Sequence, residues 1–456
     1  MPLITEEYDI LARRYEKQTT EAILRLDGQL VERGCKFGDR AIPTFWKPYF
    51  LSQEDTDDLE RVTGQIMAIL EKVVKIYLED KRLRSVFQLR PSVRKWMEID
   101  PGYKRCVVIA RPDSFLTPHG FRFIELNCDS PAGLGYADLQ ERLFCSGHLV
   151  RKLAERYEWI PPRRLDALLE ALMACYREFG GNRSKPQIAI VDWKTMRTLD
   201  EFYIIQKYFQ AKGYEAVVAD PRDLKYRSGA LYVGGFRVDL VYRRVIFDEL
   251  MAKKKDVGDF LKAYQLGKVC VINPLRSKLA ASKSLLSILT HSKYDSWFSN
   301  AEIEVKKKYI PWTRLAADTK KVYLEKKKKM TLRKLIERHQ HDFVLKPSDS
   351  YGGKGVRIGR ETTPKVWRAT INRAFRQQEN WVVQEYVPIP QMTVPVLNRK
   401  KKLVIVRKKM NINPYILGGK YAGAIARLSD ESVINVSAGG GLIPVVTYSR
   451  KGKARS

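Results

Sequence analysis

A glycine-rich segment directly after a short apolar run constrains the fold of this chain more than any other feature. The segment Phe343-Val-Leu-Lys-Pro-Ser-Asp-Ser-Tyr-Gly-Gly-Lys-Gly-Val356 predicts a strand that delivers Lys346, followed by a tight loop that carries Lys354. The glycines of the loop are Gly352, Gly353 and Gly355. Because glycine has no Cβ, the N–H groups of such a loop can approach phosphate oxygens, and the two lysines add positive charge. An ordinary hairpin has the same pattern, and the segment is neither a Walker A loop nor a G-x-G-x-x-G fingerprint.

A second strand supports a phosphate site by its position. Residues Trp381-Val-Val-Gln-Glu-Tyr-Val-Pro388 predict a buried strand that ends in a polar pair and a proline. The backbone amide and carbonyl groups at such a strand end can bind the edge of a purine, although a plain core strand has the same composition. Its place downstream of the glycine-rich segment favours a nucleotide pocket.

Oxygen-bearing side chains gather far upstream, on a predicted hairpin with strands at residues 107–110 and 121–126. Glu125 and Asn127 lie two residues apart on a strand, so their side chains leave the same face, and Asp113 on the other arm can reach that face. Two carboxylates and an amide oxygen suit Mg²⁺, which prefers oxygen ligands and shares its shell with substrate phosphates. A surface hairpin with a salt bridge from Arg111 to one of these acids is the alternative.

A further glycine-rich loop follows Arg427 near the C-terminal end of the sequence, in Val433-Ile-Asn-Val-Ser-Ala-Gly-Gly-Gly441. Its small residues are Ser437, Gly439, Gly440 and Gly441. Such a loop can close over a nucleotide and exclude water, which would protect an acyl phosphate from hydrolysis. A plain surface loop fits the pattern equally well.

The remaining pattern predicts a multidomain protein that mixes α+β and α/β architecture. Apolar residues recur at three- and four-residue spacing in residues 6–30 and 55–79, so residues 1–100 are expected to be mainly helical. A strand at 187–191, a helix at 199–212 and a strand at 215–219 predict a βαβ unit. Further helices are expected at residues 139–156, 165–179 and 278–289, and further strands at 231–233, 240–242, 404–408 and 422–428. The expected domains are residues 1–100, 101–185, 186–270 and 271–456.

Composition narrows the class of protein. Apolar residues make up 44% of the chain, enough for a substantial core, and no run approaches eighteen apolar residues, so we expect no membrane span. The six cysteines show neither C-x-x-C pairs nor zinc-finger spacing, and no secretory signal is visible, which favours a cytoplasmic protein. The formal net charge of +31 favours acidic partners, among them nucleic acid, although lysine runs are more often solvated surface.

Together these motifs resemble the circularly permuted ATP-grasp ligases, in particular the glutathionylspermidine synthase-like family, with a weaker similarity to eukaryotic-type glutathione synthase. The resemblance rests on Arg-x-Asp, Glu-x-Asn, Val-Leu-Lys-Pro before a glycine-rich loop, Gln-Glu-Tyr-Val, and Asn-Val-Ser-x-Gly-Gly, in that order over residues 100–447. It implies an ATP-grasp fold in which residues 186–270 form the substrate lobe and residues 271–456 bind the nucleotide.

The resemblance also implies roles for individual residues. Arg111 would stabilise the acyl phosphate or the tetrahedral species, and Arg427 is placed with it as a catalytic residue. The implied magnesium ligands are Asp113, Glu125 and Asn127. The implied nucleotide-binding residues are Lys283, Lys346, Gly352, Gly353, Lys354, Gly355, Gln384, Glu385, Tyr386, Val387, Gly439 and Gly440. The segment between Lys283 and Lys346 is longer and richer in lysine than in the family pattern.

The implied reaction uses ATP and Mg²⁺ to activate a small-molecule or peptide carboxylate as an acyl phosphate, which an amine then attacks to form an amide. Two alternatives stay open. One is a nucleic-acid-binding protein without catalysis, suggested by the basic charge and by 23 tyrosines. The other is an ATP-grasp phosphotransferase that stops at the phosphorylated product. The acid, the amine and the oligomeric state do not follow from the sequence.

Overall fold

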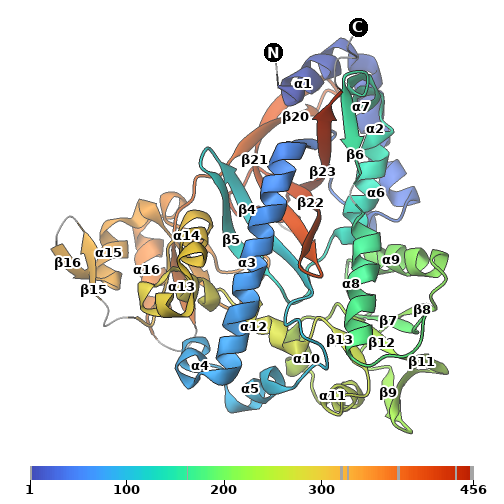
Figure 1. Ribbon diagram of the computed structural model, residues 1–456. Coiled ribbons are helices and arrows are strands. Elements are labelled where there is room, and N and C mark those ends of the chain that lie inside the picture. The colour runs from blue at the N-terminus through green and yellow to red at the C-terminus, as the bar shows by residue number, and fades with distance from the viewer. Residues whose placement is uncertain are drawn as a thin grey trace.

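A large mixed sheet organises the protein (Figure 1). The computed structural model describes residues 3–161, 163–318, 322–325, 328–376, 380–436 and 439–451. Its strand order is β3-β23-β22-β21-β4-β5, with β20 pairing β21 and β6 pairing β23. The strands are β3 (Tyr49–Ser52), β4 (Ile109–Thr117), β5 (Gly120–Asn127), β6 (Tyr157–Ile160), β20 (Gln391–Leu397), β21 (Leu403–Leu417), β22 (Lys420–Ser429) and β23 (Gly441–Arg450). Strands from both halves of the sequence therefore build one sheet.

The N-terminal region is mainly helical, as predicted. Its helices are α1 (Ile4–Arg14), α2 (Glu16–Glu32), α3 (Gln53–Glu79), α4 (Lys81–Phe87) and α5 (Pro91–Glu98). The helical periodicity over residues 6–30 belongs to two helices, α1 and α2, which are separated at Tyr15. Ser52 caps α3, and the buried stripe that includes Ile66, Leu70 and Val73 packs α3 against β22. The short strands β1 (Lys36–Phe37) and β2 (Arg40–Ala41) complete this region.

The predicted hairpin is confirmed as β4 and β5, but its first strand is longer than expected. It runs from Ile109 to Thr117, so Arg111 and Asp113 lie within the strand. Arg111 stands opposite Asn127, and Asp113 stands opposite Glu125. Because β21 also pairs with β4, the hairpin is fixed beside strands that lie about three hundred residues later in the sequence.

The helices after the hairpin are α6 (Leu134–Cys145), α7 (His148–Leu153) and α8 (Arg164–Glu178). The prediction of one continuous helix over residues 139–156 is wrong, because the chain turns at Ser146 and Gly147. A Cβ on Gly147 would lie 2.9 Å from the carbonyl oxygen of Phe144, so the turn requires glycine.

The predicted βαβ unit is confirmed within a parallel sheet of order β13-β12-β7-β8. Its elements are β7 (Ile188–Val191), α9 (Leu199–Ala211), β8 (Ala216–Ala219), β12 (Leu240–Arg243) and β13 (Cys270–Ile272). A small antiparallel sheet of β9 (Leu224–Arg227), β10 (Ala230–Val233) and β11 (Phe236–Val238) extends it, with helices α10 (Phe247–Ala252) and α11 (Gly258–Gln265). In parallel sheets, ligands bind at the carboxyl ends of the strands, and α10 begins just beyond that end of β12.

A third sheet, of order β14-β19-β17-β18, carries the glycine-rich segment. Its strands are β14 (Thr313–Leu315), β17 (Phe343–Pro347), β18 (Arg357–Ile358) and β19 (Trp381–Glu385), accompanied by the hairpin β15 (Val322–Glu325) and β16 (Lys328–Thr331). Its helices are α12 (Lys278–Ala281), α13 (Ser284–Thr290), α14 (Asn300–Tyr309), α15 (Leu332–Arg338) and α16 (Pro364–Ala374), with 3₁₀ turns at Leu275–Ser277, Ser292–Trp297, Gln340–Asp342 and Gly359–Glu361. Helices α13 to α16 lie to the left of the large sheet in Figure 1. The predicted helix at 278–289 is wrong as one element, because it breaks at Ser282 and Lys283.

Asn273, directly after β13, joins the parallel sheet to the base of the β4–β5 hairpin. Its Oδ1 accepts from the N–H groups of Val108 and Ile109 at 2.9 and 2.8 Å. Its Nδ2 donates to the carbonyl oxygens of Ile109, Cys128 and Asp129 at 2.8, 2.9 and 3.1 Å. One buried amide thus holds both ends of the hairpin.

We expect Asn273→Ala to lower the free energy of unfolding by about 3 kcal/mol, because it leaves buried backbone groups without partners. Asn300→Ala, at an exposed helix position, is the matched control and should cost under about 0.5 kcal/mol. Urea unfolding measures both, and equal losses in the two variants would contradict this role for Asn273.

Within the described part of the chain, the helices are all too short or too polar to cross a lipid bilayer.

Candidate active site

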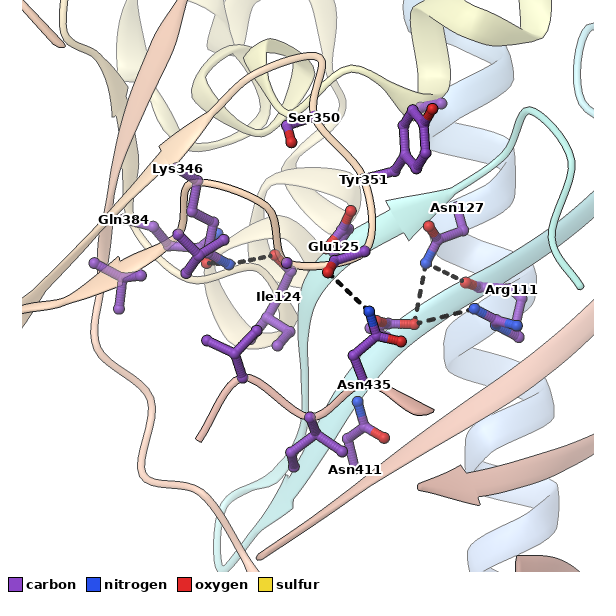
Figure 2. Close-up of a pocket in the computed structure, with 18 of the residues that line it drawn as sticks. Arg111, Ile124, Glu125, Asn127, Lys346, Ser350, Tyr351, Gln384, Asn411 and Asn435 are labelled. Carbon is purple, nitrogen blue, oxygen red and sulfur yellow. Dashed lines mark hydrogen bonds and ion pairs between the residues drawn. The ribbon is translucent and has the colours of Figure 1, made fainter. Parts of the chain in front are cut away.

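A cavity of about 330 Å³ lies where the hairpin β4–β5, the glycine-rich loop, the end of β19 and the loop before β23 meet (Figure 2). Its size falls in the range of small-molecule pockets. Of the residues predicted from sequence, the cavity is lined by Arg111, Asp113, Glu125, Asn127, Lys346, Gly352, Gly353, Gln384, Glu385, Tyr386, Val387 and Arg427. Segments up to about three hundred residues apart in the sequence thus converge on one pocket.

One end of the cavity is apolar. Its apolar lining includes Phe115, Ile124, Val344, Val356, Ile358, Val387, Ile389 and Ile434. Three of these, Phe115, Val387 and Ile434, form a small buried cluster that joins the hairpin to both later segments. A flat aromatic ring such as a purine suits this end, because aliphatic side chains can pack on its faces; Glu385, Tyr386 and Val387 also line the cavity.

The other end is charged. Asp113 is in contact with Arg427, and its Oδ1 accepts from Asn127 Nδ2 at 3.0 Å. Glu125 Oε1 lies 2.9 Å from Lys283 Nζ. Facing carboxylates on neighbouring strands repel each other, and these two cations offset that repulsion.

The donor set fits a magnesium ion that shares its shell with phosphate. Asp113 and Glu125 stand opposite each other, and the amide of Asn127 turns its nitrogen to Asp113 and to the carbonyl oxygen of Arg111, which leaves its oxygen for a ligand (Figure 2). Within the described ranges no group of three His, Cys, Asp or Glu side chains is gathered for a metal, so a metal here would need Asn127 and non-protein oxygens.

Lys346 is buried between the two sheets. Its Nζ donates to the carbonyl oxygen of Ile124 at 3.1 Å and to Gln384 Oε1 at 2.7 Å (Figure 2). Burial lowers the pKa of Lys346 to about 8, partly opposed by the negative charge of Glu125. The side chain therefore links the sheet of the glycine-rich segment to the hairpin that carries the acids.

Lys283 reaches the same region from the break between α12 and α13. Besides its ion pair with Glu125, its Nζ donates to the carbonyl oxygen of Ser350, and its backbone N–H donates to the carbonyl oxygen of Ser348 at 3.0 Å. The break between the two helices, which the apolar periodicity does not predict, points this lysine at the glycine-rich loop. Its side chain is nearly fully buried.

The glycine-rich loop touches the pocket with only part of its length. Gly352 and Gly353 line the cavity, whereas Lys354 and Gly355 are absent from its lining. Gly353 has φ +74°, and a Cβ there would lie 2.2 Å from Val433 Cγ1. Gly353 therefore meets both conditions that exclude other residues, a left-handed backbone and a close neighbour.

The loop before β23 contributes different residues from those predicted. Ser432, Val433, Ile434 and Asn435 line the cavity, and Asn435 Nδ2 donates to the carbonyl oxygen of Gly352 at 2.8 Å (Figure 2). Gly439 and Gly440 are not among the lining residues; instead Gly440 N–H donates to the carbonyl oxygen of Asn435 at 3.0 Å. Ser437 lies outside the described residues. The glycines shape this loop, and its polar residues face the cavity.

Arg111 lies at the far edge of the charged end. One of its guanidinium nitrogens lies 4.0 Å from Asp113 Oδ1, and another donates to the carbonyl oxygen of Ala132. Its Nε is buried and has no hydrogen-bond partner among the residues that the structure describes. A buried donor of this kind can bind a negatively charged ligand group at little desolvation cost.

Several lining residues were missed from the sequence. Lys278 Nζ bridges Asp248 and Asp349 at 2.6 and 3.1 Å, which ties the glycine-rich loop to α10. Tyr351 Oη donates to Glu249 Oε1 at 3.0 Å and makes a second such tie. These pairs join residues that lie between 30 and 102 positions apart in the sequence, and no spacing rule identifies them.

Comparison with known proteins gives a fold and no family. No protein-family model matches the chain. An uncharacterised protein of Mycobacterium leprae (strain TN) is 21% identical over 93% of this chain and 76% of the relative. The structure of a glutathione synthetase-like effector from Globodera pallida, in its apo form, matches 93% of this chain and 96% of its own with a TM-score of 0.63 at 12% identity. D-alanyl-alanine synthetase A from Vibrio cholerae matches 51% of this chain with a TM-score of 0.28, too low to inform the fold.

The chain therefore has the mixed α+β fold of a glutathione synthetase-like protein. This supports the predicted ATP-grasp-like fold at the level of architecture.

Proposed function

We propose that this protein is an ATP- and magnesium-dependent carboxylate–amine ligase that forms an amide through an acyl phosphate. Its arrangement would be that of a circularly permuted ATP-grasp enzyme, since the hairpin β4–β5 precedes the glycine-rich segment in sequence, yet its strand β4 pairs with the late strand β21. The fold it shares with the glutathione synthetase-like effector is consistent with this proposal.

One observation carries the proposal. The acids and amide of the hairpin, Asp113, Glu125 and Asn127, line the same cavity as Lys346 and the glycine-rich loop. An apolar end for a purine and a charged end for phosphates are the two halves of a nucleotide site. A surface hairpin with an incidental salt bridge would have no reason to face that loop.

Phosphoryl transfer would depend mainly on positioning. Lys346, Lys283 and the N–H groups of the glycine-rich loop would hold the triphosphate, and the substrate carboxylate would attack the γ-phosphorus as ADP leaves. Asp113, Glu125 and Asn127 would hold magnesium, which when bound withdraws charge from the phosphoryl group.

Amide formation would follow at the carbonyl carbon of the acyl phosphate. The amine nitrogen attacks that carbon, inorganic phosphate leaves, and the nitrogen loses a proton. Arg111 and Arg427 would stabilise the oxyanion of the tetrahedral species, because both guanidinium groups border the charged end of the cavity. The contacts of Asn435 and Tyr351 would keep the loops closed over the reacting groups.

The test is phosphate release from ATP with magnesium, screened against amino acids, short acidic peptides and polyamines. A ligase releases phosphate only when both an acid and an amine are present, and mass spectrometry then finds the amide. A phosphorylated product without amide would identify a phosphotransferase. Absence of ATP binding, with salt-sensitive binding to nucleic acid, would favour the non-catalytic alternative.

Gly353→Ala should weaken ATP binding without unfolding the protein. A residue with a Cβ in left-handed backbone costs about 1–2 kcal/mol, and the methyl group would also push against Val433, so we expect about tenfold lower affinity. Gly235→Ala is the control, because a Cβ there would have no described residue within 4 Å apart from its chain neighbours. Isothermal titration with ATP measures both, and unchanged affinity in Gly353→Ala would show that this loop does not hold the nucleotide.

ATP affinity should also depend on pH through Lys346, whose pKa is about 8. Measured in EDTA, affinity should fall about tenfold between pH 7 and pH 9, because the ammonium group loses its charge. Lys346→Gln should abolish this dependence. The stability of the protein without ATP should change with pH in the opposite direction. Below pH 8 the buried lysine is charged, which lowers the free energy of unfolding, and this cost disappears as the pH rises from 8 toward about 10.4.

A further inference from the structure

The resemblance to the ATP-grasp ligases implies that Gln384 lines the adenine pocket, but the structure turns its side chain toward Lys346. Gln384 Oε1 accepts from Lys346 Nζ at 2.7 Å, and Gln384 Nε2 donates to Thr313 Oγ1 at 3.1 Å. The hydroxyl of Thr313 in turn donates to the carbonyl oxygen of Pro311 at 2.9 Å. The three side chains come from β17, β19 and β14, three neighbouring strands of one sheet.

The direction of this chain of hydrogen bonds is fixed by chemistry. A lysine ammonium group can only donate, so the amide oxygen of Gln384 must face it, and the amide nitrogen must face Thr313. Thr313 can accept that bond because its own proton is already directed to Pro311. All three side chains are buried, with exposed fractions of 6% for Lys346, 1% for Gln384 and 0% for Thr313. In such surroundings each bond is strong and each lost partner is costly.

The same geometry sets the direction of Lys346. Of its three N–H groups, one is directed to the carbonyl oxygen of Ile124 and one to Gln384. The tetrahedral ammonium group then has one donor left, and because Lys346 lines the cavity this donor is available to a phosphate oxygen. Without Gln384 the ammonium group could rotate, and its remaining N–H group would then point toward the phosphate oxygen for less of the time.

We infer that Gln384, held by Thr313, is a positioning residue that aims Lys346 at the nucleotide phosphates. This inference rests on the proposed nucleotide site and goes beyond it, because it removes Gln384 from the set of adenine contacts. It also predicts that the two residues act as one unit, so that Gln384 matters only while Lys346 is present.

A double-mutant cycle on ATP affinity tests this coupling. We expect Gln384→Met, which keeps the length of the side chain, to weaken ATP binding about tenfold, in the range of a lost hydrogen bond to a charged group. In a Lys346→Met background the same substitution should change affinity by less than about twofold. Thr313→Val should give a smaller loss, of about threefold, that also vanishes in that background.

Gln340→Met is the matched control, since Gln340 is a partly buried glutamine of the same lobe that bonds to the backbone at Gly359 and Thr362 and does not line the cavity. Its effect on ATP affinity should be the same with Lys346 or Met at position 346. Thermal unfolding confirms that each variant is folded.

The outcomes separate the two proposals. Full additivity of Gln384→Met and Lys346→Met, or no loss in Gln384→Met, would overturn the positioning role while leaving a nucleotide site. A wild-type protein that binds no ATP would instead overturn the proposed function.

Discussion

Glu125→Gln should lower ATP turnover by about a thousandfold, the largest effect expected of any single substitution in this protein. Glutamine keeps the size of the side chain but removes the negative charge that pairs with Lys283 at 2.9 Å and stands opposite Asp113. A neutral amide is a much weaker ligand for magnesium. Turnover is measured as phosphate release with the acid and amine that give the highest rate.

Glu304→Gln is the control for this prediction. Glu304 forms an exposed ion pair with Lys307 at 3.1 Å on α14, and exposed pairs contribute little. ATP turnover by Glu304→Gln should equal that of the wild type. If Glu125→Gln kept turnover within about threefold, the hairpin would not be a metal site.

Arg427→Met should lower kcat by about a hundredfold with little change in KM for ATP, because the guanidinium group contacts Asp113 of the acidic hairpin. Its Nη2 contacts Asp113 and donates to Asn413 Oδ1 at 3.1 Å. Arg427→Lys restores the charge without the planar fork, so it should recover only part of the rate.

Arg407→Met is the matched control for Arg427, since Arg407 is an exposed arginine on the neighbouring strand β21 and does not line the cavity. Steady-state kinetics should not distinguish this variant from the wild type. A rise in KM for ATP in Arg427→Met, with kcat unchanged, would instead place Arg427 on the nucleotide.

The hairpin was predictable because the sequence pattern that specifies it lies within a short segment of the chain. Strand periodicity alone places Glu125 and Asn127 on one face, and a turn of Thr, Pro, His and Gly brings Asp113 across from them. The strand ending at Lys346 and the βαβ unit follow from similarly local patterns. Such features need no knowledge of the rest of the chain.

The remaining parts of the site depend on contacts between distant segments. The direction of Lys283 depends on a helix break inside an apolar run whose periodicity favours one continuous helix. Gln384 lies on a strand whose sequence is typical of a core strand or of a purine contact. Its hydrogen bonds depend on Lys346 and Thr313, which lie on other strands. In the loop before β23, the sequence pattern predicts that glycines bind the nucleotide, whereas in the structure Asn435 makes the contact to Gly352.

The same limit explains Asn273 and the ties to α10. Asn273 bonds to backbone groups about 150 residues earlier, and asparagine before proline reads simply as the start of a new segment. Lys278 and Tyr351 meet acids of α10 that have no distinguishing pattern in the sequence. Periodicity predicts elements, and long-range packing decides which side chains meet.

Isothermal titration of the wild type and of Glu125→Gln with ATP, each with and without magnesium, tests the central claim most directly. The convergence of the hairpin acids with Lys346 predicts that magnesium tightens ATP binding to the wild type by at least about tenfold and leaves binding to Glu125→Gln nearly unchanged. An equal effect of magnesium on both proteins, or no ATP binding by the wild type, would contradict it.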